Sequence, residues 1–289
     1  MTESWPPESG GLPGPPAGAG DGPGGAELPG EPGAPRMPGR FGPRVRHAVD
    51  PWQVWIRRAE HLAATHAQGV PLPAWLRPTR GERRWPVTLS VAVAIALQLL
   101  LPPHLTQPLP RWLLPGLEVA LGIGLTIANP VRIERRGKVV RAASIALIVL
   151  ITVANAAAAV LLIKAILENE AGNKAGPLLA TGASVWATNV IAFALWYWEF
   201  DRGGPVRRAL GTKQHPDMLF PQMTSPELAP VDWEPRFVDY LYTSFTNATA
   251  FSPTDVMPLA RWAKLTMLIQ SAVSLGVGAL VIARAVNIL

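Results

Sequence analysis

The feature that most constrains the fold is an unbroken run of 22 uncharged residues, from Ala142 to Ile163. A helix of that length rises about 33 Å at 1.5 Å per residue, which exceeds the hydrocarbon core of about 30 Å. Lipid offers no water to backbone polar groups, so an apolar run of this length predicts a helix rather than irregular chain. With similar runs elsewhere, we predict an all-α, polytopic transmembrane bundle.

Five spans and one shorter helix are expected within residues 85–289. The spans are predicted at about 85–103, 112–129, 142–163, 178–198 and 260–286. The semi-polar segment 237–251 reaches only about 22 Å as a helix, which is short for a full crossing. It either crosses, giving six spans, or dips into the membrane and returns, giving five, and the sequence leaves both open.

The chain before the first predicted span has a different composition. Residues 1–48 are rich in glycine and proline and contain few large aliphatic side chains, so we predict a disordered tail. Residues 50–84 combine a helix carrying Trp52 and Trp55 on one face with a basic juxtamembrane segment. That helix suits either a membrane surface or the protein's own cytoplasmic face.

Charge and cysteine content narrow the class further. The net charge is +6, but the arginines flank apolar runs, where basic residues set membrane orientation, so nucleic acid is not expected as a partner. The basic segments before the first span and at 130–141 predict a cytoplasmic N-terminus. Heavy use of alanine, proline, glycine and arginine is associated with GC-rich bacterial genomes, so a bacterial inner membrane is expected. Cysteine is absent, which excludes disulfides and thiolate metal sites within this sequence.

A few polar residues fall in or near the apolar segments and are the candidate functional residues. Ionisable groups in membrane helices are costly, and buried amides join helices or face a wet path. No catalytic triad, metal-spaced cluster or phosphate-binding loop accompanies them, so no enzyme, metal or cofactor is predicted. The candidate pore or polar-network residues are Glu118, Asn155, Asn189, Thr246, Asn247, Thr249 and Asp255.

Four stretches of the membrane region carry a resemblance to a known group of proteins. They are Trp112–Pro115, Trp196–Pro205, Phe220–Pro226 and Ser244–Asp255. Through them, the region from about residue 85 to 289 resembles uncharacterised bacterial, actinobacterial-type integral membrane proteins. That group has no established activity, so the resemblance implies a membrane fold and no chemistry.

The C-terminal stretch is also similar to the pore module of two-helix potassium channels, which consists of a pore helix, a filter and an inner helix. The matching pore-helix positions are Leu241, Tyr242, Ser244, Phe245 and Thr249, and Asp255 follows the filter position. The filter itself is degenerate, because residues 250–254 read Ala-Phe-Ser-Pro-Thr and lack both glycines. No potassium-binding role is therefore expected.

The leading hypothesis is a non-enzymatic, channel- or transporter-like membrane protein in which Thr246, Asn247 and Thr249 face a path for a small solute or ion. The alternative is a non-conducting scaffold that recruits partners through the tail and loop 200–235. The candidate partners are the lipid bilayer, a second copy of the chain and a small solute or ion. An intramembrane enzyme using Glu118 would need a second catalytic group, which the sequence does not offer.

Overall fold

A computed structural model describes residues 73–105, 110, 112–128, 137–170, 174–213, 215–249 and 255–288. The described chain is mostly helical, and three of its helices are long and apolar enough to span a membrane. These are α4 (Lys138–Leu167), α5 (Ala175–Phe200) and α9 (Arg261–Ile288). The prediction of a helical membrane protein is confirmed at this level.

The five predicted spans are not supported, because the first two helices are short. Helix α2 (Trp85–Leu99) has 15 residues and α3 (Leu113–Ala128) has 16. They rise only about 22 and 24 Å, which is less than the hydrocarbon thickness. The first predicted span was extended to residue 103, but α2 ends at Leu99, shortly before the Pro102–Pro103 pair that disfavours continued helix.

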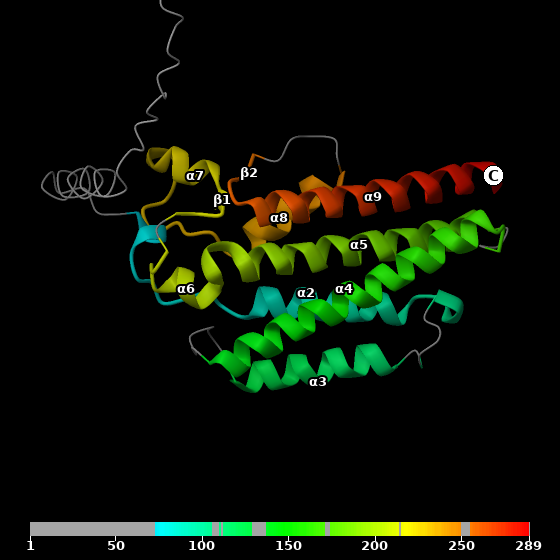
Figure 1. Cartoon of the computed structure of the whole chain (residues 1–289), viewed down its shortest axis with the longest axis horizontal. Helices are drawn as coiled ribbons and strands as arrows, with labels where there is room; N and C mark the ends of the chain where they lie inside the picture. Colours follow the sequence, from blue (N-terminus) through cyan, green and yellow to red (C-terminus); the bar gives the residue numbers. More distant parts are fainter. Residues whose placement is uncertain are drawn as a thin grey trace, which may run out of the picture. The chain divides into compact units, whose positions relative to one another are not determined.

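Helix α5 lies at the centre of the bundle, with α8 and α9 on one side and α2 and α4 on the other (Figure 1). Its second half is buried almost continuously, from Val190 to Leu195. Closer to its start, Gly182 permits tight packing, since a Cβ there would lie 2.7 Å from a methyl group of Val281 in α9. A small residue at such a crossing lets two membrane helices approach closely.

Short elements gather where α2, α4 and α9 begin and α5 ends. The segment 200–235, predicted without regular structure, forms several of them and is folded over this end of the bundle. The short elements at this end are η1 (Ala74–Leu76), η3 (Asp201–Gly203), α6 (Pro205–Ala209), β1 (Met218–Leu219), α7 (Pro221–Thr224), η4 (Pro226–Leu228) and β2 (Met257–Pro258). The remaining one, η2 (Pro103–Leu105), lies at the opposite end, beyond the end of α2.

Helix α8 (Phe237–Thr249) is the short helix expected at 237–251. Strand β1 precedes it and strand β2 follows it, and the two pair antiparallel, with Met218 opposite Pro258. The chain that leads into α8 and the chain that leads out of it toward α9 therefore meet at the same end of the bundle (Figure 1).

Several predictions fall on residues outside the described ranges. They concern the tail at 1–48, the amphipathic helix at 50–72, most of the basic loop 130–141, and the filter-like residues 250–254. They remain predictions.

Candidate functional site

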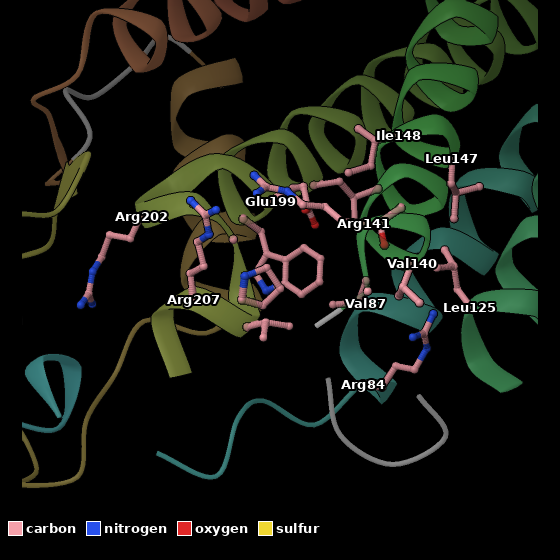
Figure 2. A pocket seen from close by; sticks show the side chains of 18 of the residues that line it. Arg84, Val87, Leu125, Val140, Arg141, Leu147, Ile148, Glu199, Arg202 and Arg207 are labelled. Carbon is pink, nitrogen blue, oxygen red and sulfur yellow. The ribbon is translucent and has the colours of Figure 1, made fainter. Parts of the chain in front are cut away.

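A cavity of about 700 Å³ opens at the end of the bundle where α2 and α4 begin and α5 ends (Figure 2). Its walls are the first turns of α2 and α4, the last turns of α5, residues 203–213, and Gly122 and Leu125 of α3. We call it the end cavity. It joins side chains that are more than one hundred residues apart in the sequence.

Positive charge dominates the lining of the end cavity. A single carboxylate, Glu199, stands against six basic residues, and it lies 3.5 Å from Nε of Arg141. The basic lining residues are Arg84, Lys138, Arg141, Arg202, Arg207 and Lys213.

Two of these six charges are engaged elsewhere. The guanidinium of Arg202 lies 5.7 Å from the ring centre of Trp75, and Nζ of Lys213 donates to Asp217 at 2.7 Å. In Figure 2 the Arg202 side chain accordingly points away from the apolar wall of the cavity. The cationic character of the cavity therefore depends on the other four basic side chains.

Those four are Arg84, Lys138, Arg141 and Arg207, and within the described residues only Arg141 has an ion-pair partner. Nε of Arg84 is buried and has no hydrogen-bond acceptor, whereas Nε of Arg141 has only the 3.5 Å ion pair with Glu199, which lacks hydrogen-bond geometry. A buried donor without an acceptor costs about 1–3 kcal/mol. An anion inside the cavity would supply the missing acceptors, so the arrangement is suited to anion binding.

A left-handed turn after α5 brings Arg207 back to the cavity. Arg202, Gly203 and Gly204 all have positive φ, at 54°, 83° and 101°. Glycine is required at the last two positions because a Cβ on Gly203 would lie 2.7 Å from Cδ of Arg207, and φ at Gly204 also disfavours larger residues. Pro205 then starts α6 at a position where its missing N–H costs nothing.

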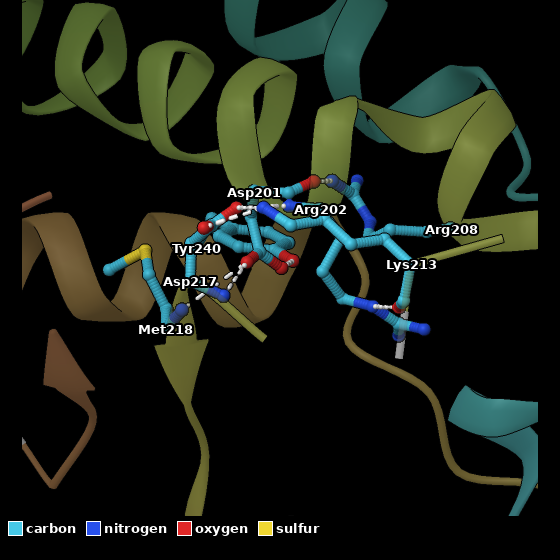
Figure 3. A network of polar contacts seen from close by, with 7 residues as sticks. All are labelled: Asp201, Arg202, Arg208, Lys213, Asp217, Met218 and Tyr240. Atoms are coloured by element: carbon cyan, nitrogen blue, oxygen red, sulfur yellow. Dashed lines mark hydrogen bonds and ion pairs between the residues drawn. The ribbon is translucent and has the colours of Figure 1, made fainter. Parts of the chain in front are cut away.

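A buried network around Asp201 fixes this turn (Figure 3). The Asp201 carboxylate accepts hydrogen bonds from Tyr240 Oη at 2.6 Å, from the amide of Asp217 at 3.0 Å and from the amide of Met218 at 3.3 Å. Asp217 Oδ2 in turn accepts from the amide of Arg202 at 2.8 Å. The network joins the end of α5 to β1 and α8.

Arg208 and Glu82 extend this framework. Nη1 of Arg208 donates to the carbonyl oxygens of Trp198 and Asp201, at 2.5 and 2.9 Å. Glu82 accepts from Trp198 Nε1 at 2.7 Å and from the amide of Phe237 at 2.5 Å, which ties the first residue of α8 to the end of α5. Burial raises the pKa of Glu82 above its ordinary value, while these two hydrogen bonds oppose the rise.

A second network lies between α5, α8 and α9, with Gln270 at its centre. Gln270 Oε1 accepts from Tyr197 Oη at 2.6 Å and from Asn247 Nδ2 at 2.8 Å. Its Nε2 donates to the carbonyl and hydroxyl oxygens of Ser244, at 2.9 and 2.7 Å. One turn further along α9, Ser274 accepts from Asn189 at 2.9 Å.

The predicted polar stripe of α8 divides between two environments. Asn247 faces α9, where it also donates to the Met267 carbonyl at 3.0 Å. The hydroxyls of Thr246 and Thr249 bond carbonyl oxygens within α8 itself. Asp255 is exposed beyond the helix. The structure therefore brings Asn247, but not the rest of the stripe, into a network between helices.

Glu118 and Asn155 lie apart from these networks. Asn155 is buried in α4. Glu118 is fully buried in α3 and faces Gln98 of α2, yet neither carboxylate oxygen nor Nε2 of Gln98 has a hydrogen bond that meets normal geometry. Among the predicted residues, Glu118 alone is a fully buried, unsatisfied group in the described chain.

The sequence reasoning missed Gln270 and the residues of the end cavity. A signal for Gln270 existed, because it is the amide inside the uncharged run from Leu265 to Ala283. No comparable signal marked the cavity, since Arg84, Lys138 and Arg207 each look like ordinary flanking charges.

No protein-family model, curated protein or solved structure matches this chain. The resemblances to uncharacterised bacterial membrane proteins and to a potassium-channel pore module therefore remain predictions. Within the described residues, no group of three or more histidine, aspartate or glutamate side chains could hold a metal ion.

Proposed function

We propose that this is a transporter- or channel-like membrane protein whose end cavity binds an anionic ligand. The observation that carries the proposal is the cluster of Arg84, Lys138, Arg141 and Arg207 around one carboxylate, Glu199. Guanidinium groups bind phosphate and carboxylate through paired hydrogen bonds, and the buried Nε of Arg84 lacks an acceptor.

The proposed topology has five crossings in a bacterial inner membrane, with a cytoplasmic N-terminus. The shortness of α2 and α3 is compatible with crossing if the bilayer thins locally or flanking side chains snorkel. The basic residues Arg84, Lys138 and Arg207 share the end of the bundle that holds the cavity, which supports a cytoplasmic location for that end.

In this topology α8 is re-entrant and does not cross. The pairing of β1 with β2 supports this form, because it holds the approach to α8 and the return from it at one end of the bundle. The C-terminus of α9 then lies on the periplasmic side. A single cysteine introduced at Asn287 should react with a membrane-impermeant maleimide added outside spheroplasts, whereas one introduced at His215 should not.

Anion binding is tested by thermal unfolding of the purified full-length chain at constant ionic strength. Inorganic phosphate and glycerol phosphate should raise the apparent Tm relative to chloride. Arg141→Gln should reduce that shift, and the exposed Arg83→Gln should leave it unchanged. An equal shift with chloride in the wild-type protein would refute the proposed site. Flux of the same anions into proteoliposomes then distinguishes transport from binding alone.

A scaffold function is the second candidate, and exposed apolar residues in segment 200–235 favour it. Leu228 is 84% exposed and Val231 is 67% exposed. If the protein is a scaffold, Leu228→Ser and Val231→Ser together should abolish partner recruitment without changing anion binding. If it is transporter-like, Arg141→Gln should weaken anion binding without changing partner recruitment.

A further inference from the structure

We infer that the end cavity holds an anionic phospholipid, with its phosphate among the basic side chains and one acyl chain along the apolar wall. This inference rests on the proposed anion site and names the class of its ligand. It adds a requirement that a small soluble anion does not have, because the ligand must fill an apolar compartment as well as a cationic one.

The apolar compartment is continuous with the cationic rim. In Figure 2, the basic groups of Arg207 and Arg141 lie toward α5, and aliphatic side chains occupy the side toward α3 and α4. Aliphatic lining of this kind does not favour ordered water, which needs polar partners. The apolar lining residues are Val87, Val91, Leu125, Val140, Leu147, Ile148 and Leu195.

The depth of the cavity corresponds to one leaflet of a bilayer. Its lining residues on α4 run from Lys138 to Ile148, a rise of about 15 Å at 1.5 Å per residue. On α2 they run from Arg84 to Val91, about 10 Å. Half of a hydrocarbon core of about 30 Å is about 15 Å, and Ile148 lies about 10 Å beyond Arg141, so basic residues at headgroup depth leave the apolar wall within one leaflet.

The wall contributed by α3 has room for a chain. Gly122 lines the cavity, and a Cβ built on it would meet no described atom within 4 Å. Basic pockets between membrane helices on the cytoplasmic side are the kind of site that binds anionic lipid headgroups. At the cationic rim, Nε of Arg84 is buried and has no acceptor, and a lipid phosphate would supply one.

The structure offers a matched pair of variants for each half of the ligand. Arg84→Gln removes a lining cation, and Arg83→Gln removes its exposed neighbour, which does not line the cavity. Gly122→Leu fills the apolar compartment. Gly124→Leu adds the same bulk to α3 outside the cavity, where a Cβ is equally free of contacts.

The experiment measures lipid retention by native mass spectrometry of the delipidated full-length protein. The probes are phosphatidylglycerol, phosphatidylcholine with the same acyl chains, and glycerol phosphate, which lacks chains. We expect phosphatidylglycerol to bind at least tenfold more tightly than either other probe. Arg84→Gln and Gly122→Leu should each weaken it at least tenfold, and Arg83→Gln and Gly124→Leu should not.

Each other result overturns the inference in an identifiable way. If glycerol phosphate binds as tightly as phosphatidylglycerol and Gly122→Leu has no effect, the lipid assignment fails but the anion site stands. If no anionic probe binds, both fail. If phosphatidylglycerol binds equally to all four variants, the lipid is a non-specific annular one, and the inference is wrong.

Discussion

Gln270 in α9 and Glu118 in α3 are both fully buried polar side chains on apolar helices, but their surroundings differ. Gln270 takes part in four hydrogen bonds that reach α5 and α8. Glu118 faces Gln98 and has none. The interface of α5, α8 and α9 is thus joined by polar contacts around Gln270, whereas the interface of α2 and α3 relies on apolar packing and leaves Glu118 and Nε2 of Gln98 without hydrogen bonds.

This difference in hydrogen bonding distinguishes buried polar groups that hold helices together from buried polar groups that are available to a ligand. A saturated buried network holds helices in one arrangement and offers no group to a ligand. Unsatisfied buried groups cost stability, so their presence around the end cavity points to a site where something else is bound. The end cavity, rather than the polar stripe of α8, is where ligand binding is expected.

The largest expected effect is the loss of Asp201, whose carboxylate serves three donors at the end of α5. Asp201→Ala should destabilise the protein by about 3–5 kcal/mol, because it leaves buried donors and the nearby Arg208 charge without their partner. Urea unfolding in detergent measures this. The exposed Asp255→Ala is the control, and equal effects of the two changes would contradict the network.

Gln270→Leu should cost about 2 kcal/mol, since four hydrogen bonds between helices are lost at about 0.6 kcal/mol each. The same unfolding measurement applies. Thr246→Ala is the matched control, because its hydroxyl bonds only the backbone of its own helix and its loss should change stability little. If Gln270→Leu lowers the free energy of unfolding no more than Thr246→Ala does, the Gln270 network does not stabilise the packing of α5, α8 and α9.

Glu118→Leu should have the opposite sign and stabilise the protein by about 1 kcal/mol, because a buried polar group without hydrogen bonds is unfavourable. The midpoint of urea unfolding should therefore rise. Gln98→Leu should behave in the same way. A loss of more than about 1 kcal/mol for Glu118→Leu would mean that the carboxylate has a stabilising partner, such as a bound cation.

The smallest expected effect is a pH dependence from Glu82, which burial holds at a raised pKa beside Arg208 and Glu234. The folded state then binds the proton more tightly than the unfolded state, so the contribution of Glu82 to stability is full below about pH 4.3 and falls as pH rises through the folded pKa. As the pH rises from about 4.3 through the folded pKa of Glu82, the difference in unfolding free energy between the wild type and Glu82→Gln should shrink. A difference that grows with pH would have the wrong sign.

Part of the candidate site could be predicted from the sequence. Asn189 and Asn247 were expected as amides that either join helices or face a path, and both donate hydrogen bonds to α9. Glu118 was expected as a costly intramembrane carboxylate, and it is buried without partners. These expectations needed only the position of a polar residue within an apolar run.

The end cavity could not be predicted in this way. Arg84 immediately precedes α2, Arg141 lies in α4 and Arg207 lies in α6, and each one satisfies the general pattern of basic residues beside a membrane helix. Their convergence depends on how α2 and α4 are rotated about their axes and on the left-handed turn at Arg202. Neither the rotation of these helices nor the turn at Arg202 can be predicted from the hydropathy of the sequence.

The sequence by itself determined that this chain is a helical membrane protein, because uncharged runs of 20 residues or more have few alternatives in water or lipid. The tertiary structure decided which runs form helices long enough to span, where the chain before α8 pairs with the chain after it, and which buried polar groups find partners. The physical reason is that hydrophobic length is a local property of one segment. Hydrogen-bond satisfaction and cavity charge arise only when several helices are packed in a definite register.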